Sequence, residues 1–143
     1  LWVGGEGPAI ADCHTKAKEL GLEARVRFCG ETIERDAFLK SIDALLVPPG
    51  DAGETFFIPQ AWSHGTPVIS ALEAKSSPVI DGENGLQLAD NTPDNWSAAI
   101  GRITGDEREL AKTLIKGGLS AYEASYRPEA FAQMLARNFF PDK

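Results

Sequence analysis

The residue of greatest chemical interest is Glu54, which lies in the stretch LLVPPGDAGETFFIPQAWSHGTPVIS at residues 45–70. An apolar run opens this stretch, a loop of Pro, Gly and Asp follows, and Glu54 stands shortly before the aromatic pair Phe56 and Phe57. A carboxylate only accepts hydrogen bonds, so it suits a ligand that presents hydroxyl groups. The loop also follows a predicted strand, which is where α/β proteins bind their ligands.

Residues 4–8, GGEGP, form a second candidate site, a glycine-rich turn between a predicted strand and a predicted helix. The free N–H groups at the start of a helix favour anions, so Gly5 and Gly7 could border a phosphate. The segment fails as a GxGxxG dinucleotide fingerprint, because the third glycine would fall at Ile10. A tight turn without a ligand therefore remains an alternative.

Composition and charge limit the classes of partner. A chain of 143 residues with 43% hydrophobic residues suits one domain with a real core. The formal net charge of −7 disfavours a surface for nucleic acid or for an anionic membrane. No apolar run approaches the roughly 20 residues that span a bilayer, and no signal-peptide pattern opens the chain.

The cysteines and histidines carry little chemistry in this sequence. Cys13 and Cys29 have no CxxC spacing, so reduced thiols in a cytoplasmic protein are expected rather than a disulfide. The two histidines, His14 and His64, have no metal-site spacing. Because no acidic cluster suited to Mg²⁺ is present either, no metal ion is implied.

Short apolar runs alternate with segments of helical periodicity along the chain. The predicted strands are residues 1–4, 26–30, 44–48, 67–70 and 86–89. The predicted helices are residues 8–21, 33–42, 58–64, 94–104 and 106–140, the last with breaks at Gly117-Gly118 and Arg127-Pro128. Continuous apolar strands that alternate with helices indicate an α/β fold, a doubly wound parallel sheet covered on both faces.

This fold predicts where side chains should lie. Core positions are predicted for Phe38, Leu39, Ile42 and Trp62. The side chains of Trp96, Phe131, Met134 and Leu135 are expected to dock onto the sheet or onto a half of the protein that this sequence does not include. Because ligands bind beyond the carboxyl ends of parallel strands, we expect Glu54 at the mouth of a cleft there, with Gly30 and Gly85 nearby.

Five segments, taken in order, resemble one known family. The segments are LWVGGEGP…AKELGLEARVRFCG, SIDALLVPP, GETFFIPQAWSHGTPVI, VIDGENGLQLAD and YEASYRPEAFAQML. The first is similar to VGxGP…LGLxxxVxFxG, the third to E-G/S-F-G-x-x-x-x-E-A-x-A-x-G-x-P-V-I, and the fourth to xxDGxxGxLV. These are passages of the C-terminal, donor-binding half of GT-B glycosyltransferases, family four of the retaining enzymes. The resemblance covers nearly the whole chain.

The resemblance implies retaining transfer of a hexose-type sugar from a nucleotide-sugar donor to an acceptor glycan or lipid-linked glycan. Glu54 matches the family's first acid, which contacts donor-sugar hydroxyls, and is the candidate catalytic residue. The N–H groups of residues 55–57 would face the diphosphate, and Gln60 would hold the ribose. The other implied donor-binding residues are Gly5, Gly7, Phe28, Gly30, Thr32, Thr55, Phe56, Phe57 and Lys75, with residues 26–32 framing the base. No further cofactor is implied.

Three positions depart from the family pattern. Gln60 replaces the second acid and follows Glu54 by six residues instead of eight. Phe57 stands where the family usually has glycine, which allows backbone to approach phosphate closely. The family's G-G-x-P-E reads AKSSPV at residues 74–79 and lacks the acid, although Lys75 could help to hold a phosphate. A non-catalytic GT-B-like domain is therefore an alternative, and a nicotinamide or flavin oxidoreductase is a second one.

The resemblance aligns residue 1 with the second strand of the family's C-terminal domain. A first strand–helix unit and the acceptor-binding N-terminal half are then expected to be absent from the chain, and contact with the inner face of a membrane would be made through that half. We predict that the missing strand lies between residues 1–4 and residues 67–70. Two strands with unpaired edges recruit other chains, so something should fill the gap.

Overall fold

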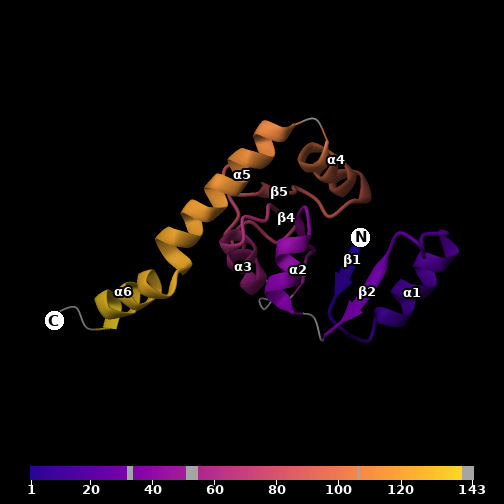
Figure 1. Ribbon diagram of the computed structural model, residues 1–143, viewed down its shortest axis with the longest axis horizontal. Coiled ribbons are helices and arrows are strands. Elements are labelled where there is room, and N and C mark those ends of the chain that lie inside the picture. The colour runs from indigo at the N-terminus through magenta and orange to yellow at the C-terminus, as the bar shows by residue number, and fades with distance from the viewer. Residues whose placement is uncertain (32–33, 51–54, 106, 140–143) are drawn as a thin grey trace. The chain divides into compact units, whose positions relative to one another are not determined.

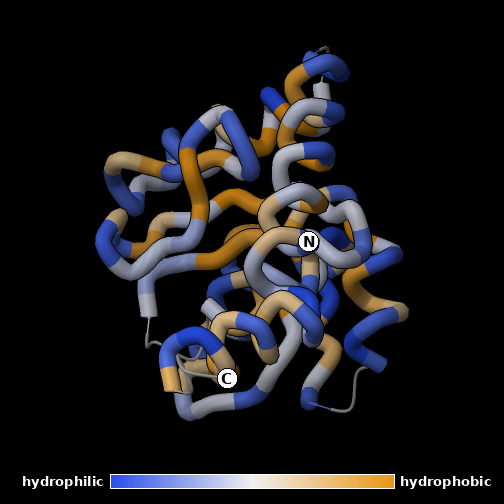
Figure 2. The backbone as a smooth tube through the Cα atoms, turned by 90° about the vertical axis from the view of Figure 1, so that its left-hand side faces the viewer, coloured by the Kyte–Doolittle hydropathy of each residue, from blue (hydrophilic) through white to orange (hydrophobic). Residues whose placement is uncertain are grey.

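The computed structural model describes residues 1–31, 34–50, 55–105 and 107–139 (Figure 1). The chain forms two compact units, one from Leu1 to Phe38 and one from Leu39 onward. Helix α2, Arg35–Ser41, begins in the first unit and ends in the second. Hydrophilic and hydrophobic residues alternate along the helices in Figure 2, as expected for helices with one face on a core.

The first unit is a strand–helix–strand arrangement. Strands β1, Trp2–Gly4, and β2, Arg27–Gly30, are parallel and are connected through helix α1, Ile10–Glu19. The register pairs Val3 with Phe28 and shifts between Val3 and Gly4. Helix α1 ends before Gly21, whose φ of +64° is a backbone conformation that favours glycine.

The second unit contains a parallel sheet in the order β3-β4-β5. The strands are β3, Leu45–Val47, β4, Val68–Ser70, and β5, Leu86–Gln87. The helices are α3, Phe57–Ser63, α4, Pro93–Thr104, α5, Arg108–Ala121, and α6, Pro128–Phe139, with a π-helical turn, Tyr122–Tyr126, between the last two. The predicted α/β class with parallel strands is confirmed.

The core of the second unit is built around β4. All three residues of this strand are buried, and because alternate side chains point to opposite faces, both faces of β4 are covered. One core cluster joins Ile69 of β4 to residues of β5, α4 and α5, namely Leu86, Ala99, Ile103 and Leu114. Trp96 packs partly buried against this cluster, as predicted. Trp62 and Leu39 are buried as predicted, whereas Phe38 and Ile42 are half-buried.

The predicted helix break at Gly117-Gly118 is wrong. Helix α5 runs through both glycines, although glycine inside a helix costs about 1 kcal/mol relative to alanine. The reason is packing: a methyl group at Gly118 would overlap the Trp62 ring, and one at Gly117 would overlap the carbonyl oxygen of Glu83. The predicted break before Pro128 is confirmed, since Arg127 is extended with φ −60° and ψ 141°.

Two further predictions about packing need correction. Strand β4 pairs with β3 on one side and with β5 on the other, so a gap beside residues 67–70 does not exist. In α6, Phe131, Met134 and Leu135 are exposed, so they do not dock onto the sheet as one alternative required. Their face of α6 has the spacing of an amphipathic helix without a covering element among the described residues.

Candidate functional site

Two glycines join the carboxyl ends of β1 and β2 in the first unit. Gly5 has a φ of +105° and donates its N–H to the carbonyl oxygen of Gly30 at 3.0 Å. Gly30 has a φ of +68°, and a Cβ there would lie 3.3 Å from Oε1 of Glu6. Positive φ angles disfavour residues with a Cβ, so both positions need glycine for the turn itself. The structure thus brings Gly5 and Gly30 together, with the Gly5 N–H already used in this pairing.

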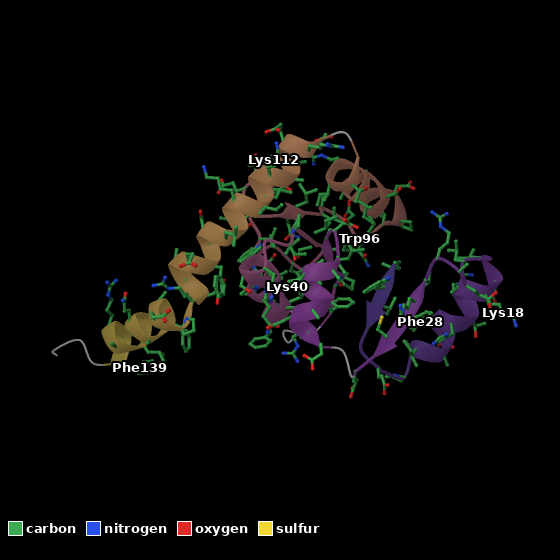
Figure 3. All side chains as sticks on the ribbon, viewed as in Figure 1. Lys18, Phe28, Lys40, Trp96, Lys112 and Phe139 are labelled. Carbon is green, nitrogen blue, oxygen red and sulfur yellow. The ribbon has the colours of Figure 1, made fainter. Side chains whose placement is uncertain are left out.

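Phe28 packs against α1 in the first unit (Figure 3). Its ring lies on the imidazole of His14, with centroids 3.8 Å apart and planes at 31°. The sequence-based prediction missed this role of His14. The signal was present, because His14 lies four residues after Ile10 and three before the buried Ala17, a spacing that puts all three on one helix face.

The other two first-unit candidates have simpler descriptions. Gly7 is exposed, and its carbonyl oxygen accepts a hydrogen bond from Ile10 N at 3.1 Å in the turn that starts α1. Thr32 lies outside the described residues.

An aromatic pair precedes and begins α3 in the second unit. Phe56 is 63% exposed and Phe57 is 39% exposed, and their rings meet edge-on with centroids 6.4 Å apart. Phe57 is the first residue of α3, and the described residues contain no non-glycine residue with positive φ. The position where the family has glycine therefore does not require glycine for its backbone conformation here. Glu54 lies outside the described residues, and Thr55 is half-buried in the turn before the helix.

Gln60 lies in the first turn of α3 and is half-buried. Its carbonyl oxygen accepts a hydrogen bond from the Ser63 hydroxyl at 2.7 Å. Since Gln60 and Phe57 are three residues apart, they lie on neighbouring positions of one helix surface. Helix α3 thus positions both candidates on one short, rigid element.

The loop after β4 is held by polar side chains. Ser70, fully buried at the end of β4, accepts a hydrogen bond from Leu72 N at 3.2 Å, and its hydroxyl lies 3.4 Å from that of Ser77. The amide nitrogen of Gln87 donates to the carbonyl oxygen of Leu72 at 2.8 Å. Within this loop the sequence predicted a ligand contact only for Lys75. The sequence shows no pattern that separates Ser70 and Gln87, which hold this loop, from other polar residues on short strands.

Lys75 is exposed in this same loop. Its ammonium group pairs with the Glu73 carboxylate at 2.7 Å, and both side chains are mostly exposed. Exposed ion pairs of this kind contribute at most about 1 kcal/mol, so the pair can exchange for another anion at low cost.

The expectation that Gly85 lies at the carboxyl edge of the sheet is wrong. The register pairs Leu86 with Ile69, which puts Gly85 level with Val68, the first residue of β4. A Cβ at Gly85 would lie 2.9 Å from the carbonyl oxygen of Val68 and 2.8 Å from Cγ1 of Val79. The loop that leaves the carboxyl end of β4 runs back alongside β4, and β5 begins only after that. The last residue of the loop, Gly85, therefore lies at the amino end of β4.

Other site classes find no support in the part of the chain that the structure describes. No helix there has the length and apolar character needed to cross a bilayer. No group of three His, Cys, Asp or Glu side chains among those residues could hold a metal ion. Cys13 and Cys29 are free cysteines, the first exposed and the second half-buried.

Comparisons with known proteins agree on one family. A family model described as "Glycosyl transferases group 1" matches residues 1–106. The chain is 30% identical over 141 residues to the lipopolysaccharide core biosynthesis glycosyltransferase LpsE of Rhizobium meliloti (strain 1021). The aligned region covers 95% of this chain and 41% of LpsE. The chain thus spans about two-fifths of this curated relative.

Solved structures agree on the fold. HepE of Anabaena, in complex with UDP and glucose, has a TM-score of 0.80 at 21% identity over 96% of this chain and 39% of HepE. The C-terminal domain of LpcC from Francisella tularensis has a TM-score of 0.67 at 17% identity over 83% of this chain and 63% of that domain. The fold is that of the C-terminal half of these GT-B neighbours.

Proposed function

We propose that this chain, which belongs to the group 1 glycosyl transferases, binds the nucleotide-sugar donor in a glycosyltransferase. The observation that carries the proposal is the family match over residues 1–106, a range that includes every candidate site residue from Gly5 to Lys75. Its similarity to a lipopolysaccharide core glycosyltransferase supports a glycan or lipid-linked glycan as the acceptor. HepE, the structural neighbour solved with UDP and glucose, supports a nucleotide sugar as the donor.

The donor sugar and the diphosphate would be held by the loop after β3. Glu54 would accept hydrogen bonds from hydroxyls of a hexose-type sugar, and its carboxylate is suited to this because it has only acceptors. The N–H groups of Thr55, Phe56 and Phe57 would face the diphosphate, since the positive end of the helix dipole lies at a helix N-terminus and attracts anions. Lys75 would add a cation by leaving its exposed pairing with Glu73.

The remaining proposed contacts are with the nucleoside. Gln60 would accept a hydrogen bond from a ribose hydroxyl, more weakly than a carboxylate would. The base would be framed by residues 26–32, which include Phe28, Gly30 and Thr32, and Gly5 and Gly7 would border the phosphates. Transfer would proceed with retention at the anomeric carbon, in a cytoplasmic protein whose N-terminal half binds the acceptor.

One observation favours a second candidate function, a GT-B-like domain that binds without catalysis. Phe57 stands where the family has glycine, and the residue is 39% exposed, with its ring against that of Phe56. A ring at this position restricts how closely a phosphate can approach the backbone. Such a domain would bind a sugar or nucleotide without positioning it for transfer.

Calorimetric titration of the complete protein tests the proposal. We expect UDP or GDP, and the matching nucleotide sugar, to bind, and we expect release of the nucleoside diphosphate when a glycan acceptor is added. Binding without release would favour the non-catalytic domain. Binding of NADH in place of UDP and GDP would refute the glycosyltransferase proposal in favour of an oxidoreductase.

A further inference from the structure

Helix α3 carries the candidates Phe57 and Gln60, and its largest buried side chain, Trp62, bonds to a residue outside the helix. Trp62 is 1% exposed, and its indole Nε1 donates a hydrogen bond to the carbonyl oxygen of Asn84 at 2.9 Å. On another side its ring meets the ring of Tyr126, with centroids 5.8 Å apart. The anchor therefore ties α3 to the turn before β5.

Asn84 extends this anchor into the loop that follows β4. Its Oδ1 accepts a hydrogen bond from Ile80 N at 2.7 Å, and its Nδ2 donates to the carbonyl oxygen of Pro78 at 3.3 Å. Just upstream, the Ser77 hydroxyl accepts from Val79 N at 3.2 Å. Helix α3 and the loop that follows β4 are thus joined at one side chain, Trp62, through hydrogen bonds that are buried or partly buried.

Helix α5 packs closely against Trp62 and against the turn before β5 at Gly117 and Gly118. An added methyl group at Gly118 would overlap Trp62 Cδ1 and would lie 3.0 Å from Trp62 Nε1, the atom that makes the hydrogen bond. An added methyl group at Gly117 would overlap the carbonyl oxygen of Glu83, beside the acceptor Asn84. Because protein interiors are closely packed, a change at either glycine must move the indole or the turn.

We propose that Trp62 is a positioning residue for donor binding. It holds α3 at a set distance from the loop of residues 71–84, so that groups on α3 and groups in that loop reach one nucleoside diphosphate together. This inference rests on the proposed function, because the ligand it positions is the nucleotide of the donor. Misplacement of binding groups by about 1 Å is enough to weaken their joint action strongly.

The test compares two glycine-to-alanine variants of the complete protein, both inside helices. Gly118→Ala adds a methyl group against Trp62, whereas Gly101→Ala adds one on α4 where no atom lies within 4 Å. UDP and GDP are titrated at a temperature at which circular dichroism shows every variant folded. We expect Gly118→Ala to bind the nucleotide about tenfold more weakly or worse, with a raised KM for the nucleotide sugar, and Gly101→Ala to match the parent.

A folded Gly118→Ala protein with a lower Tm and an unchanged nucleotide affinity would overturn the inference, because a merely structural role changes stability alone. If Gly118→Ala does not fold, Trp62→Phe takes its place, with Trp96→Phe as the matched control. The indole of Trp96 also donates a hydrogen bond, to Asn91 Oδ1 at 2.8 Å, but Trp96 lies on α4 and its partner lies just before that helix. We expect weaker nucleotide binding in Trp62→Phe alone, and equal affinities in these two variants would refute the positioning role. Failure of the parent protein to bind any nucleotide would refute the proposed function instead.

Discussion

Replacing Asn84 with alanine should destabilise the second unit by releasing the turn between β4 and β5. The side chain is 6% exposed and makes two hydrogen bonds to the backbone, one from Ile80 N and one to Pro78 O. Each buried polar group left without a partner costs about 1–3 kcal/mol. Both backbone groups are partly buried, so we expect the free energy of unfolding to fall by about 2–4 kcal/mol.

Urea unfolding followed by circular dichroism measures this loss directly. In a thermal scan the same loss should lower Tm by about 4–16 °C, at about 2–4 °C per kcal/mol for a chain of this size. The control is Asn138→Ala on the exposed surface of α6, which should stay within about 0.5 kcal/mol of the parent. An equally small effect of Asn84→Ala would show that the turn does not depend on these two bonds, and the reasoning would fail.

Three further predictions follow from single contacts or from the proposed site. Gly117→Ala should lower the free energy of unfolding, because its methyl group would meet the Glu83 carbonyl oxygen, and this outweighs the about 1 kcal/mol by which alanine is favoured over glycine inside a helix. A urea titration that shows a higher free energy of unfolding would contradict this. Thr66→Val should cost about 1–3 kcal/mol, since the Thr66 hydroxyl donates to the buried Leu39 carbonyl oxygen at 2.7 Å, whereas Thr66→Ser should retain most of the stability in the same titration. Glu54→Gln in the complete protein should lower turnover more than it weakens UDP binding, because its proposed contact is with the sugar; equal losses in kinetics and calorimetry would assign Glu54 to structure.

The sequence by itself determined which segments become strands and helices, because those signals are local. Thr92 was a plausible helix cap, and its hydroxyl accepts a hydrogen bond from Asn95 N ahead of Pro93 in the first turn of α4. Gly21 follows the last turn of α1 in the conformation that glycine adopts most readily. The apolar run at β4 predicted a strand buried on both faces, and all of its residues are buried.

The candidate site was predictable only in part. The rule that loops after parallel strands meet at one edge of the sheet predicted that the ends of the first two strands lie together, and Gly5 and Gly30 do meet there. The same rule misplaced Gly85, because it says where a loop starts and not how far it has returned when the next strand begins. The contact between His14 and Phe28 was missed because the helical spacing of a lone histidine was not followed to the strand it faces.

Only the tertiary structure decided which segments meet across the chain. Gly117-Gly118 signals a break in isolation, yet both residues are helical, because α5 can approach Trp62 and the Glu83 carbonyl only where it has no Cβ. The central place of β4 was likewise invisible in its apolar run, which would look the same at either edge of a covered sheet. Local patterns record the backbone preference and the burial of each residue, whereas the identity of its neighbours depends on segments that are distant in the sequence and adjacent only after folding.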